Sequence, residues 1–324
     1  MREGRTAVSI LGLGSIGLRH ARNFAKLGAR VTAFDPDESR RSLAEAEEIE
    51  TMVDRAAALH GSDAVVIASP NKFHLYDLQA ALETGCHVFV EKPIAHTDEG
   101  VDELLDKFKN AEHIVFCGFN LRFHPAVMAA REAILGGHIG DILWARFQMS
   151  DYLPDWRPHT DYREGYANDP VSGGVLFDVI HEFDVANTLL GAATTVAASA
   201  RHTGLLDLQA EDCADVLLRH ESGVISALHI DYATRPRRRA YEIAGSKGIL
   251  SIDLDARSLT MTITSGEQKT EIYPGSYAED YANEARDFLR CIETGSAPAC
   301  DGYQALTVLR QVLRARELAG LPSS

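Results

Sequence analysis

Long apolar runs and clustered cysteines are both missing from this sequence. No apolar segment approaches the ~20 residues that a membrane-spanning helix needs. The first apolar run meets a glycine-rich turn where a signal peptide would carry its cleavage site. The cysteines are far apart and odd in number, and they form no CxxC or Cys/His cluster: Cys86, Cys117, Cys213, Cys291 and Cys300. We therefore expect no metal site, free thiols and a cytoplasmic protein.

An excess of positive charge is also absent. The 324 residues include 47 acidic and 32 basic side chains, so the formal net charge is −15. A protein that wraps nucleic acid needs a basic surface, and this balance argues against such a partner while leaving room for a local anion site. The composition, 45% hydrophobic and 24% charged, is that of an ordinary globular protein whose chain is long enough for two domains.

The pattern of apolar residues changes near residue 121. Before it, short apolar runs such as "DAVVIAS" and "HVFVEK" alternate with helical patterns, which predicts a parallel sheet covered by helices on both faces. After it, extended runs such as "DCADVLLRH" and "GVISALHIDYA" are separated by turns, which predicts a large and mostly antiparallel sheet. Two helices close the chain. The sequence therefore predicts an α/β protein with two different sheets.

The stretch "GLGSIG" at residues 12–17 follows an apolar run and opens a helical pattern. Gly12 permits the tight turn, Gly14 lets the backbone approach a pyrophosphate, and Gly17 lets helix and strand pack closely. The start of the helix offers free N–H groups to phosphate oxygens. This context predicts a Rossmann-type dinucleotide-binding domain.

Asp35 ends the next predicted strand. A carboxylate at this point can hydrogen-bond the ribose hydroxyls of NAD and repels the extra phosphate of NADP, so we expect NAD. Arg40 and Arg41 lie just beyond and could face a phosphate, which leaves NADP open.

Two further stretches end predicted strands at the edge where open α/β sheets bind ligands. "VEKP" at 90–93 places Lys92 there, although a lysine at a strand end is as often an ordinary surface residue. "SPNKFH" at 69–74 ends the preceding strand. With the glycine turn, these stretches give the candidate cofactor-binding residues Gly12, Gly14, Ser15, Ile16, Gly17, Asp35, Ser69, Pro70, Asn71, His74, Glu91 and Lys92.

Polar side chains interrupt an apolar pattern in "GVLFDVIHEFD" at 174–184. Asp178, His181 and Asp184 recur at spacing three, so we expect them near one face of a helix. Two interpretations are open. The aspartate and histidine form a structural pair, or they transfer protons, since an imidazole with a pKa near ~6.5 accepts a proton at neutral pH.

Taken together, "GLGSIG", "SPN", "EKP", "GFNLRFHP" and "GGVLFDVIHEFD" resemble the Gfo/Idh/MocA oxidoreductases, the relatives of glucose-fructose oxidoreductase and inositol dehydrogenase. The resemblance covers nearly the whole chain. It implies a Rossmann domain over residues 1–121 and an α/β domain over 122–324 for substrate binding and oligomerisation, with the last helix free to pack back on the first domain. It further implies a homodimer or homotetramer formed through the second sheet.

The same resemblance implies the chemistry: hydride transfer between NAD(P) and a hydroxyl-bearing carbon of a cyclitol, sugar or sugar derivative. Lys92 matches the family's lysine near the reacting hydroxyl, His181 its catalytic histidine, and Asp178 the acid before it. Many members place the histidine four residues after the aspartate, whereas the gap here is three. The proton acceptor therefore stays open between Lys92 and His181, and Asp184 is expected to be structural.

The loop "DYLPDWRPHTDYREGY" at 151–166 mixes aromatic and charged side chains. Aromatic faces suit the C–H groups of sugar rings, and charged forks suit hydroxyls or carboxylates, whereas the alternative is a lid whose aromatics simply pack. The candidate substrate-binding residues are Arg122, His124, Trp156, Arg157, His159, Asp161, Tyr162, Arg163, Asp178 and His181. The loop also resembles a branch of the family associated with surface-polysaccharide and amino-sugar pathways.

The run "TRPRRR" at 234–239 is the strongest local positive charge. It is either a solvated strand edge or interface, or an anion site for a nucleotide sugar or sugar acid. Other functions of the same fold also stay open: an NAD-dependent glycosidase, a non-catalytic dinucleotide sensor that works through protein partners, and a reductase of C=N or C=C bonds. Lys92, Asp178 and His181 argue against the sensor, because a sensor needs no proton acceptor.

Overall fold

The computed structural model describes residues 5–156, 158 and 160–322. It divides into two compact units, one made of residues 1–120 and 277–306 and the other of residues 121–276 and 307–324. The resemblance placed the boundary at 121/122 and left only the last helix free to pack back on the first domain. The structure differs because the segment 277–306 belongs to the first unit, where the ring of Phe288 packs edge-on against Phe24, 6.1 Å away.

The first unit contains a six-stranded parallel sheet in the order β3-β2-β1-β4-β5-β6. The strands are β1 (Ala7–Leu11), β2 (Arg30–Phe34), β3 (Glu50–Thr51), β4 (Ala64–Ile67), β5 (His87–Glu91) and β6 (Val115–Gly118). The chain reverses its direction across the sheet between β1 and β4. Such a switch point opens a ligand crevice at the carboxyl ends of the strands.

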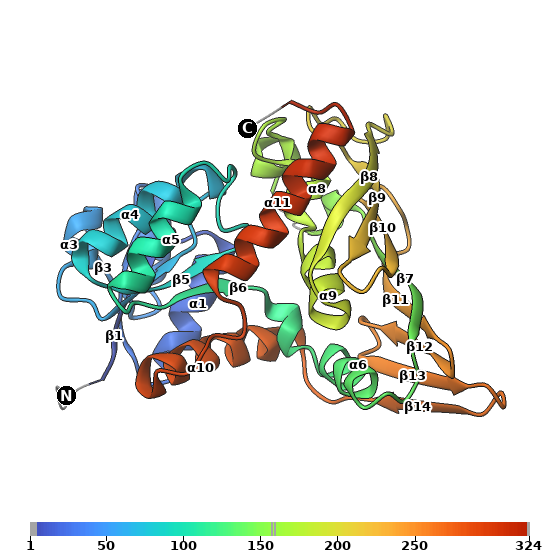
Figure 1. The fold of residues 1–324 in the computed structure, drawn as a ribbon. Helices are drawn as coiled ribbons and strands as arrows, with labels where there is room; N and C mark the ends of the chain where they lie inside the picture. Colours follow the sequence, from blue (N-terminus) through green and yellow to red (C-terminus); the bar gives the residue numbers. More distant parts are fainter. Residues whose placement is uncertain (1–4, 157, 159, 323–324) are drawn as a thin grey trace. The chain divides into compact units, whose positions relative to one another are not determined.

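Helices cover both faces of this sheet, as the alternating sequence pattern predicts. Figure 1 shows α4 and α5 on one face and α1 and α10 on the other. The helices of the unit are α1 (Ser15–Lys26), α2 (Glu38–Glu45), α3 (Arg55–Leu59), α4 (His74–Thr84), α5 (Val101–Asn110) and α10 (Tyr277–Thr294), with a short 3₁₀ turn η1 (Asn71–Phe73). The core is aromatic at its centre, where Phe89 stacks on Phe116 with ring centroids 5.0 Å apart.

The second unit contains an eight-stranded sheet in the order β14-β13-β12-β11-β7-β10-β9-β8. Its strands are β7 (Ile142–Ser150), β8 (Ala193–Arg201), β9 (Cys213–His220), β10 (Ile225–Asp231), β11 (Arg238–Gly245), β12 (Gly248–Asp253), β13 (Ser258–Ile263) and β14 (Gln268–Ile272). Only β7 and β10 pair in parallel; the other neighbours are antiparallel, which confirms the expected sheet. β14 was not expected, because all five of its residues are exposed and four are polar.

Helices of the second unit pack on one face of the sheet (Figure 1). They are α6 (Pro125–Leu135), α7 (Leu153–Trp156), α8 (Gly174–Asp178), α9 (His181–Leu190) and α11 (Gly302–Leu318), which begins in the first unit, with 3₁₀ turns η2 (Asn120–Phe123), η3 (Tyr162–Glu164) and η4 (Tyr166–Asn168). The single helix expected over 174–184 is wrong. Val179, with φ −96° and ψ 28°, leaves the helical conformation, so Asp178 ends α8 and His181 begins α9.

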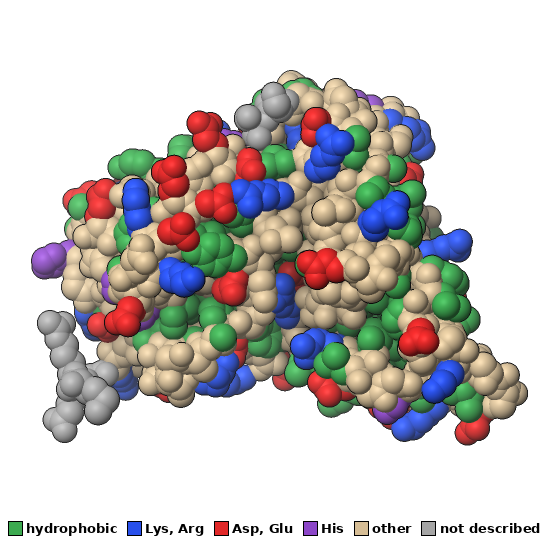
Figure 2. Space-filling view, in the orientation of Figure 1, with side chains coloured by type: hydrophobic (Ala, Val, Ile, Leu, Met, Phe, Trp, Pro, Cys, Tyr) green, Lys and Arg blue, Asp and Glu red, His purple; other side chains and the backbone are tan. Residues whose placement is uncertain are grey.

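Surface charge is mixed on the face that Figure 2 shows, where acidic and basic side chains are interspersed. Within the described part of the chain, no helix is both long and apolar enough to cross a membrane.

Candidate active site

The glycine turn between β1 and α1 has the geometry that a dinucleotide needs. Gly12 has φ +95°, and a Cβ there would lie 2.6 Å from the carbonyl oxygen of Ala68. A Cβ on Gly17 would lie 1.8 Å from the carbonyl oxygen of Gly12, so this glycine is required for packing. Gly14 has no neighbour within 4 Å of such a Cβ and receives no side-chain cap, which leaves space and amide groups of the first turn, at Ser15 and Ile16, for phosphate oxygens.

Asp35 supports this turn from the end of β2. Its buried carboxylate accepts hydrogen bonds from the N–H of Leu13 at 2.7 Å and of Asp37 at 2.9 Å. A carboxylate oxygen can accept a second bond, so ribose hydroxyls fit the same group. The guanidinium of Arg40 lies 3.4 Å from the carboxylate, whereas Arg41 donates to the carbonyl oxygen of Asp35 at 2.6 Å.

His74 joins the two loops that follow β4 and β5. Its Nε2 lies 2.8 Å from the carbonyl oxygen of Ser69, and its Nδ1 lies 2.8 Å from that of Pro93. Burial lowers the pKa of His74, so the neutral ring donates to one of these oxygens at a time. Asn71 is buried and Pro70 is exposed beside it. His74, one of the expected cofactor-binding residues, therefore connects the loop after β4 to the loop after β5.

Lys92 follows β5 and is partly exposed, and its bond to Pro93 is a cis peptide. The neighbouring Glu91 is buried. Its Oε1 lies 2.6 Å from Nε2 of His20, and its Oε2 accepts a hydrogen bond from the N–H of Lys92 at 3.3 Å.

Asp178 and His181 flank the break between α8 and α9. The hydroxyl of Tyr232 donates to Oδ2 of Asp178 at 3.0 Å, and the hydroxyl of Tyr166 donates to Oδ1. His181 is 7% exposed at the first position of α9. The sequence pattern did not reveal the two tyrosines, because Tyr166 begins the 3₁₀ turn η4 and Tyr232 follows β10, and only the fold brings them to the aspartate.

The start of α8 is held by a buried network that was also missed. Gly174 has φ +84°, and the carboxylate of Glu211 occupies the space that its side chain would fill. Glu211 accepts a hydrogen bond from the N–H of Leu176 at 3.2 Å and lies 3.3 Å from Nη1 of Arg316. Burial raises the pKa of Glu211, and the charge of Arg316 opposes that rise. The network fixes the helix that ends in Asp178.

Arg122 and His124 contact groups within the second unit. Nη2 of Arg122 donates to Asp184 at 2.6 Å and its Nε lies 3.0 Å from the other oxygen, which makes a forked ion pair with a fully buried carboxylate. His124 directly precedes α6, and its Nε2 lies 3.2 Å from the carbonyl oxygen of Leu254. Asp184 is thus a structural partner of Arg122.

The aromatic loop combines packing with exposed charge. Trp156 packs edge-on against the ring of Tyr232, with centroids 5.5 Å apart. The hydroxyl of Tyr162 accepts a hydrogen bond from the N–H of Asp207 at 3.2 Å. Hydrogen bonds from Arg163 lower the pKa of Asp161 to about 2, and both side chains are solvent-facing. Arg157 and His159, two further substrate candidates, lie outside the described residues.

The arginine run at 234–239 is largely neutralised by acids of its own unit. The pairs are Arg235 with Asp155 at 3.2 Å, Arg237 with Asp151 at 2.7 Å, and Arg239 with Glu182 at 2.7 Å. Glu182 is fully buried and also accepts the hydroxyl of Tyr241 at 2.9 Å. These contacts favour the structural interpretation of the run.

Comparison with known proteins identifies the family. Residues 6–119 match the oxidoreductase family with an NAD-binding Rossmann fold, and residues 127–251 match the GFO/IDH/MocA C-terminal domain. An inositol 2-dehydrogenase of Rhizobium meliloti (strain 1021) is 31% identical over 321 residues, which cover 93% of this chain and 92% of the relative.

Solved structures agree on the fold. A levoglucosan dehydrogenase in complex with NADH and levoglucosan has a TM-score of 0.89 at 21% identity, with 98% of this chain and 97% of that one covered. A UDP-N-acetylglucosamine 3-dehydrogenase of Acidithiobacillus ferrooxidans has a TM-score of 0.82 at 21% identity, with 97% of each chain covered. The family expected from the sequence motifs is confirmed: this chain belongs to the Gfo/Idh/MocA oxidoreductases and carries their NAD-binding Rossmann fold.

Proposed function

We propose that the protein is an NAD(P)-dependent dehydrogenase or reductase that acts on a CH–OH group of a cyclitol, sugar or sugar derivative. The observation that carries the proposal is the similarity to inositol 2-dehydrogenase over nearly the full length of both chains. The relatives reported above are named dehydrogenases, and this similarity gives no support to the glycosidase and sensor alternatives.

The first unit supplies the cofactor side of the reaction. The glycine turn would hold the pyrophosphate and Asp35 the adenosine ribose, with NAD preferred because a second negative charge beside Asp35 is repelled. Bound NAD supplies the hydride acceptor. Lys92 places an ammonium group where it stabilises the negative charge that develops on the substrate oxygen.

The second unit supplies the proton acceptor in this proposal. His181 takes the hydroxyl proton as the carbon is oxidised. Asp178, held at both oxygens by Tyr166 and Tyr232, orients the histidine or a substrate hydroxyl. Trp156, Tyr162, Asp161 and Arg163 are proposed to contact the substrate from the aromatic loop, since their side chains combine an apolar face with hydrogen-bonding groups.

Spectrophotometry of NADH formation tests this proposal. The purified protein is mixed with NAD or NADP and a panel of inositols, sugars, sugar acids and nucleotide sugars. We expect turnover with one neutral cyclitol or sugar and preference for NAD. Preference for anionic substrates would instead favour the interpretation of the arginine run as an anion-binding site. No turnover across the panel, with NAD binding confirmed by calorimetry, would contradict the dehydrogenase proposal and favour a sensor.

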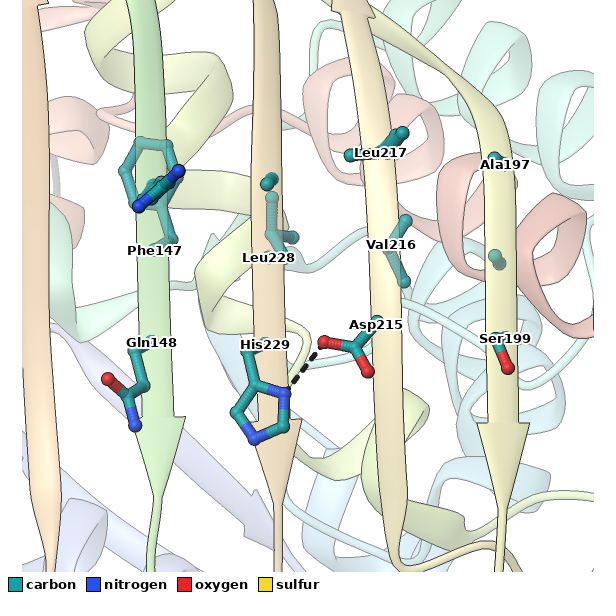
Figure 3. Close-up of a pocket in the computed structure, with 12 residues that line it drawn as sticks. Phe147, Gln148, Ala197, Ser199, Asp215, Val216, Leu217, Leu228 and His229 are labelled. Atoms are coloured by element: carbon teal, nitrogen blue, oxygen red, sulfur yellow. Dashed lines mark hydrogen bonds and ion pairs between the residues drawn. The ribbon is translucent and has the colours of Figure 1, made fainter.

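We also propose a homodimer or homotetramer formed through the second sheet. The face shown in Figure 3 carries side chains from β7, β8, β9 and β10 and mixes apolar with polar groups. Leu217, which is 40% exposed on this face, is an apolar group that an interface would bury, and it supports the proposal. Light scattering after gel filtration should give a multiple of 35.4 kDa, and Leu217→Glu should shift the mass toward one chain.

A cytoplasmic location is proposed from the thiols. All five cysteines are buried and outside any disulfide, and a reducing compartment keeps thiols in this state.

A further inference from the structure

The imidazole of His74 lies between two loops of the first unit. It is the first residue of α4 and is 1% exposed. Its Nε2 lies 2.8 Å from the carbonyl oxygen of Ser69 in the loop after β4, and its Nδ1 lies 2.8 Å from the carbonyl oxygen of Pro93 in the loop after β5. One buried ring therefore contacts the backbone of both loops.

The loop after β4 packs directly against the glycine turn. The N–H of Ala68 donates to the carbonyl oxygen of Leu11 at 2.8 Å. A Cβ on Gly12 would lie 2.6 Å from the carbonyl oxygen of Ala68 and 2.7 Å from the backbone nitrogen of Ser69. The hydroxyl of Ser69 also donates to the buried carboxylate of Asp77 at 2.6 Å. A shift of Ser69 therefore changes the surface beside the turn that receives the pyrophosphate.

The loop after β5 carries Lys92. Pro93, the next residue, has no backbone N–H, so its carbonyl oxygen is its one hydrogen-bonding group. That oxygen faces Nδ1 of His74. Ile94 and Ala95 have no exposed surface, so the chain beyond the proline is packed as well. The backbone at Lys92 is thus held by β5 on one side and by the contact with His74 on the other.

A neutral imidazole cannot donate to both loops at once. Two carbonyl acceptors require two N–H groups, and the neutral ring has only one. Burial lowers the pKa of His74, while the carbonyls of Ser69 and Pro93 and the charges of Asp77 and Glu91 oppose that effect. The nitrogen without a proton presents a lone pair to its carbonyl oxygen. Each tautomer of His74 therefore holds one loop.

We propose that His74 is a positioning residue that couples cofactor binding to the placement of Lys92. Its Nε2–H holds the Ser69 loop against the glycine turn, and its Nδ1–H holds the loop of Lys92. The effect on turnover rests on the proposed function of Lys92, whereas the effect on the two loops does not.

Two substitutions separate the two contacts. An asparagine amide lies close to the position of Nδ1, and a glutamine amide lies close to that of Nε2, so each keeps one donor. Hydrogen exchange of residues 69–73 and 92–96 is followed by mass spectrometry. His74→Asn should exchange about tenfold faster than wild type at 69–73 with a smaller change at 92–96, and His74→Gln should show the reverse. His60→Asn and His60→Gln, at an exposed position after α3, are the matched controls and should leave both segments unchanged.

Binding and turnover should divide in the same way. The Kd for NAD, measured by calorimetry, should be about tenfold weaker in His74→Asn than in His74→Gln. With an active wild type, kcat should be about tenfold lower in His74→Gln than in His74→Asn. A residue with a merely structural role would change both quantities in parallel in the two variants, and that result would overturn the proposal.

Hydrogen exchange and NAD binding need no turnover. A wild-type protein that fails the substrate panel therefore contradicts the proposed function and leaves this inference to the exchange result. If only one variant folds, its own two segments are compared, and equal acceleration of both would overturn the coupling. If neither folds, ¹⁵N NMR of labelled histidine in wild type decides: one protonated ring nitrogen is expected for His74 at neutral pH, and two would overturn the proposal.

Discussion

The hydroxyl of Tyr232 donates a hydrogen bond to Asp178 at 3.0 Å and lies 3.1 Å from the carbonyl oxygen of Gly174. Tyr232 is fully buried. Its hydrogen bond to Asp178 connects the end of α8 to the residue that follows β10. A buried acceptor that loses its donor costs about 1–3 kcal/mol. The orientation of the proposed catalytic aspartate therefore depends on a residue 54 positions away in the sequence.

Tyr232→Phe should lower the free energy of unfolding by about 1–2 kcal/mol and reduce kcat about tenfold, because Asp178 loses a buried donor. Tyr166→Phe is the matched control: it removes a donor at the exposed turn η4 and should affect kcat with little loss of stability. Urea unfolding and steady-state kinetics measure the two effects. Equal stability of Tyr232→Phe and wild type would contradict the role assigned to the buried hydroxyl.

Lys92→Ala should reduce kcat by about 10²–10⁴-fold while the Kd for NAD stays near wild type, because the ammonium acts on the substrate oxygen. Lys107→Ala, an exposed change on α5, should leave both values unchanged. Turnover and calorimetric titration with NAD separate the two quantities. Wild-type turnover in Lys92→Ala would remove this lysine from the mechanism.

Asp35→Ala should weaken NAD binding about 10–100-fold and reduce discrimination against NADP, since hydrogen bonds to a charged group contribute about 1.5–3 kcal/mol. Asp35→Asn should lie between wild type and alanine, because the amide oxygen can still accept the N–H of Leu13 but carries no charge. The Kd values for NAD and NADP are measured for all three proteins. Unchanged discrimination in the alanine variant would exclude Asp35 from cofactor selection.

The features that the sequence predicted correctly depend on residues that are close together in the chain. Gly12, Gly14 and Gly17 act through their own backbone, and the structure gives Gly12 the positive φ of a tight turn and Gly17 the close packing that the motif predicts, while the space beside Gly14 is open. The parallel and antiparallel sheets follow from short-range apolar patterns in the same way. The break at Val179 has no local signal, because the stretch contains neither proline nor an internal glycine and Val179 is a buried apolar residue like its neighbours.

The missed residues have distant partners. Tyr232 contacts Asp178, Glu211 contacts Arg316 and Glu284 approaches Glu91, and each pair is assembled only when sheets and helices are in place. A buried acid also has no sequence signature of its own, because on α10 Glu284 continues a helical pattern rich in charged residues. Tyr232 and Glu211 support Asp178 and the start of α8 without belonging to any motif of the candidate site.

Gly174→Ala should lower the free energy of unfolding by at least ~2 kcal/mol, more than backbone strain alone would cost. Gly174 has φ +84°, and the new Cβ would also clash with the carboxylate of Glu211. Gly204→Ala is the matched control, with φ +78° and open space around its Cβ, and should lose only about 1 kcal/mol. The difference in urea midpoint between the two variants isolates the clash. If the two glycines respond equally, the Glu211 network does not restrain the start of α8.

The protonation of His229 contributes to the free energy of unfolding, and this contribution depends on pH. Hydrogen bonding to Asp231 raises the pKa of His229 to about 9, burial opposes that rise, and Asp215, 2.7 Å away on β9, adds to it (Figure 3). A folded-state pKa above the unfolded value near 6.5 means that the charged ring stabilises the native state. This contribution is complete below about pH 6.5 and is lost as the pH rises through about 9.

The melting temperature of wild type should therefore exceed that of His229→Gln by on the order of 1–2 °C at pH 6, a small value because the side chain is 40% exposed and solvent screens its ion pairs. The difference should vanish above pH 9. Burial opposes the ionised form of Asp231, but hydrogen bonds from His229 and Ser150 outweigh it and lower its pKa, so this carboxylate remains a partner throughout that window. A difference that grows between pH 6 and 9 would reverse the sign and show that His229 is neutral in the folded protein.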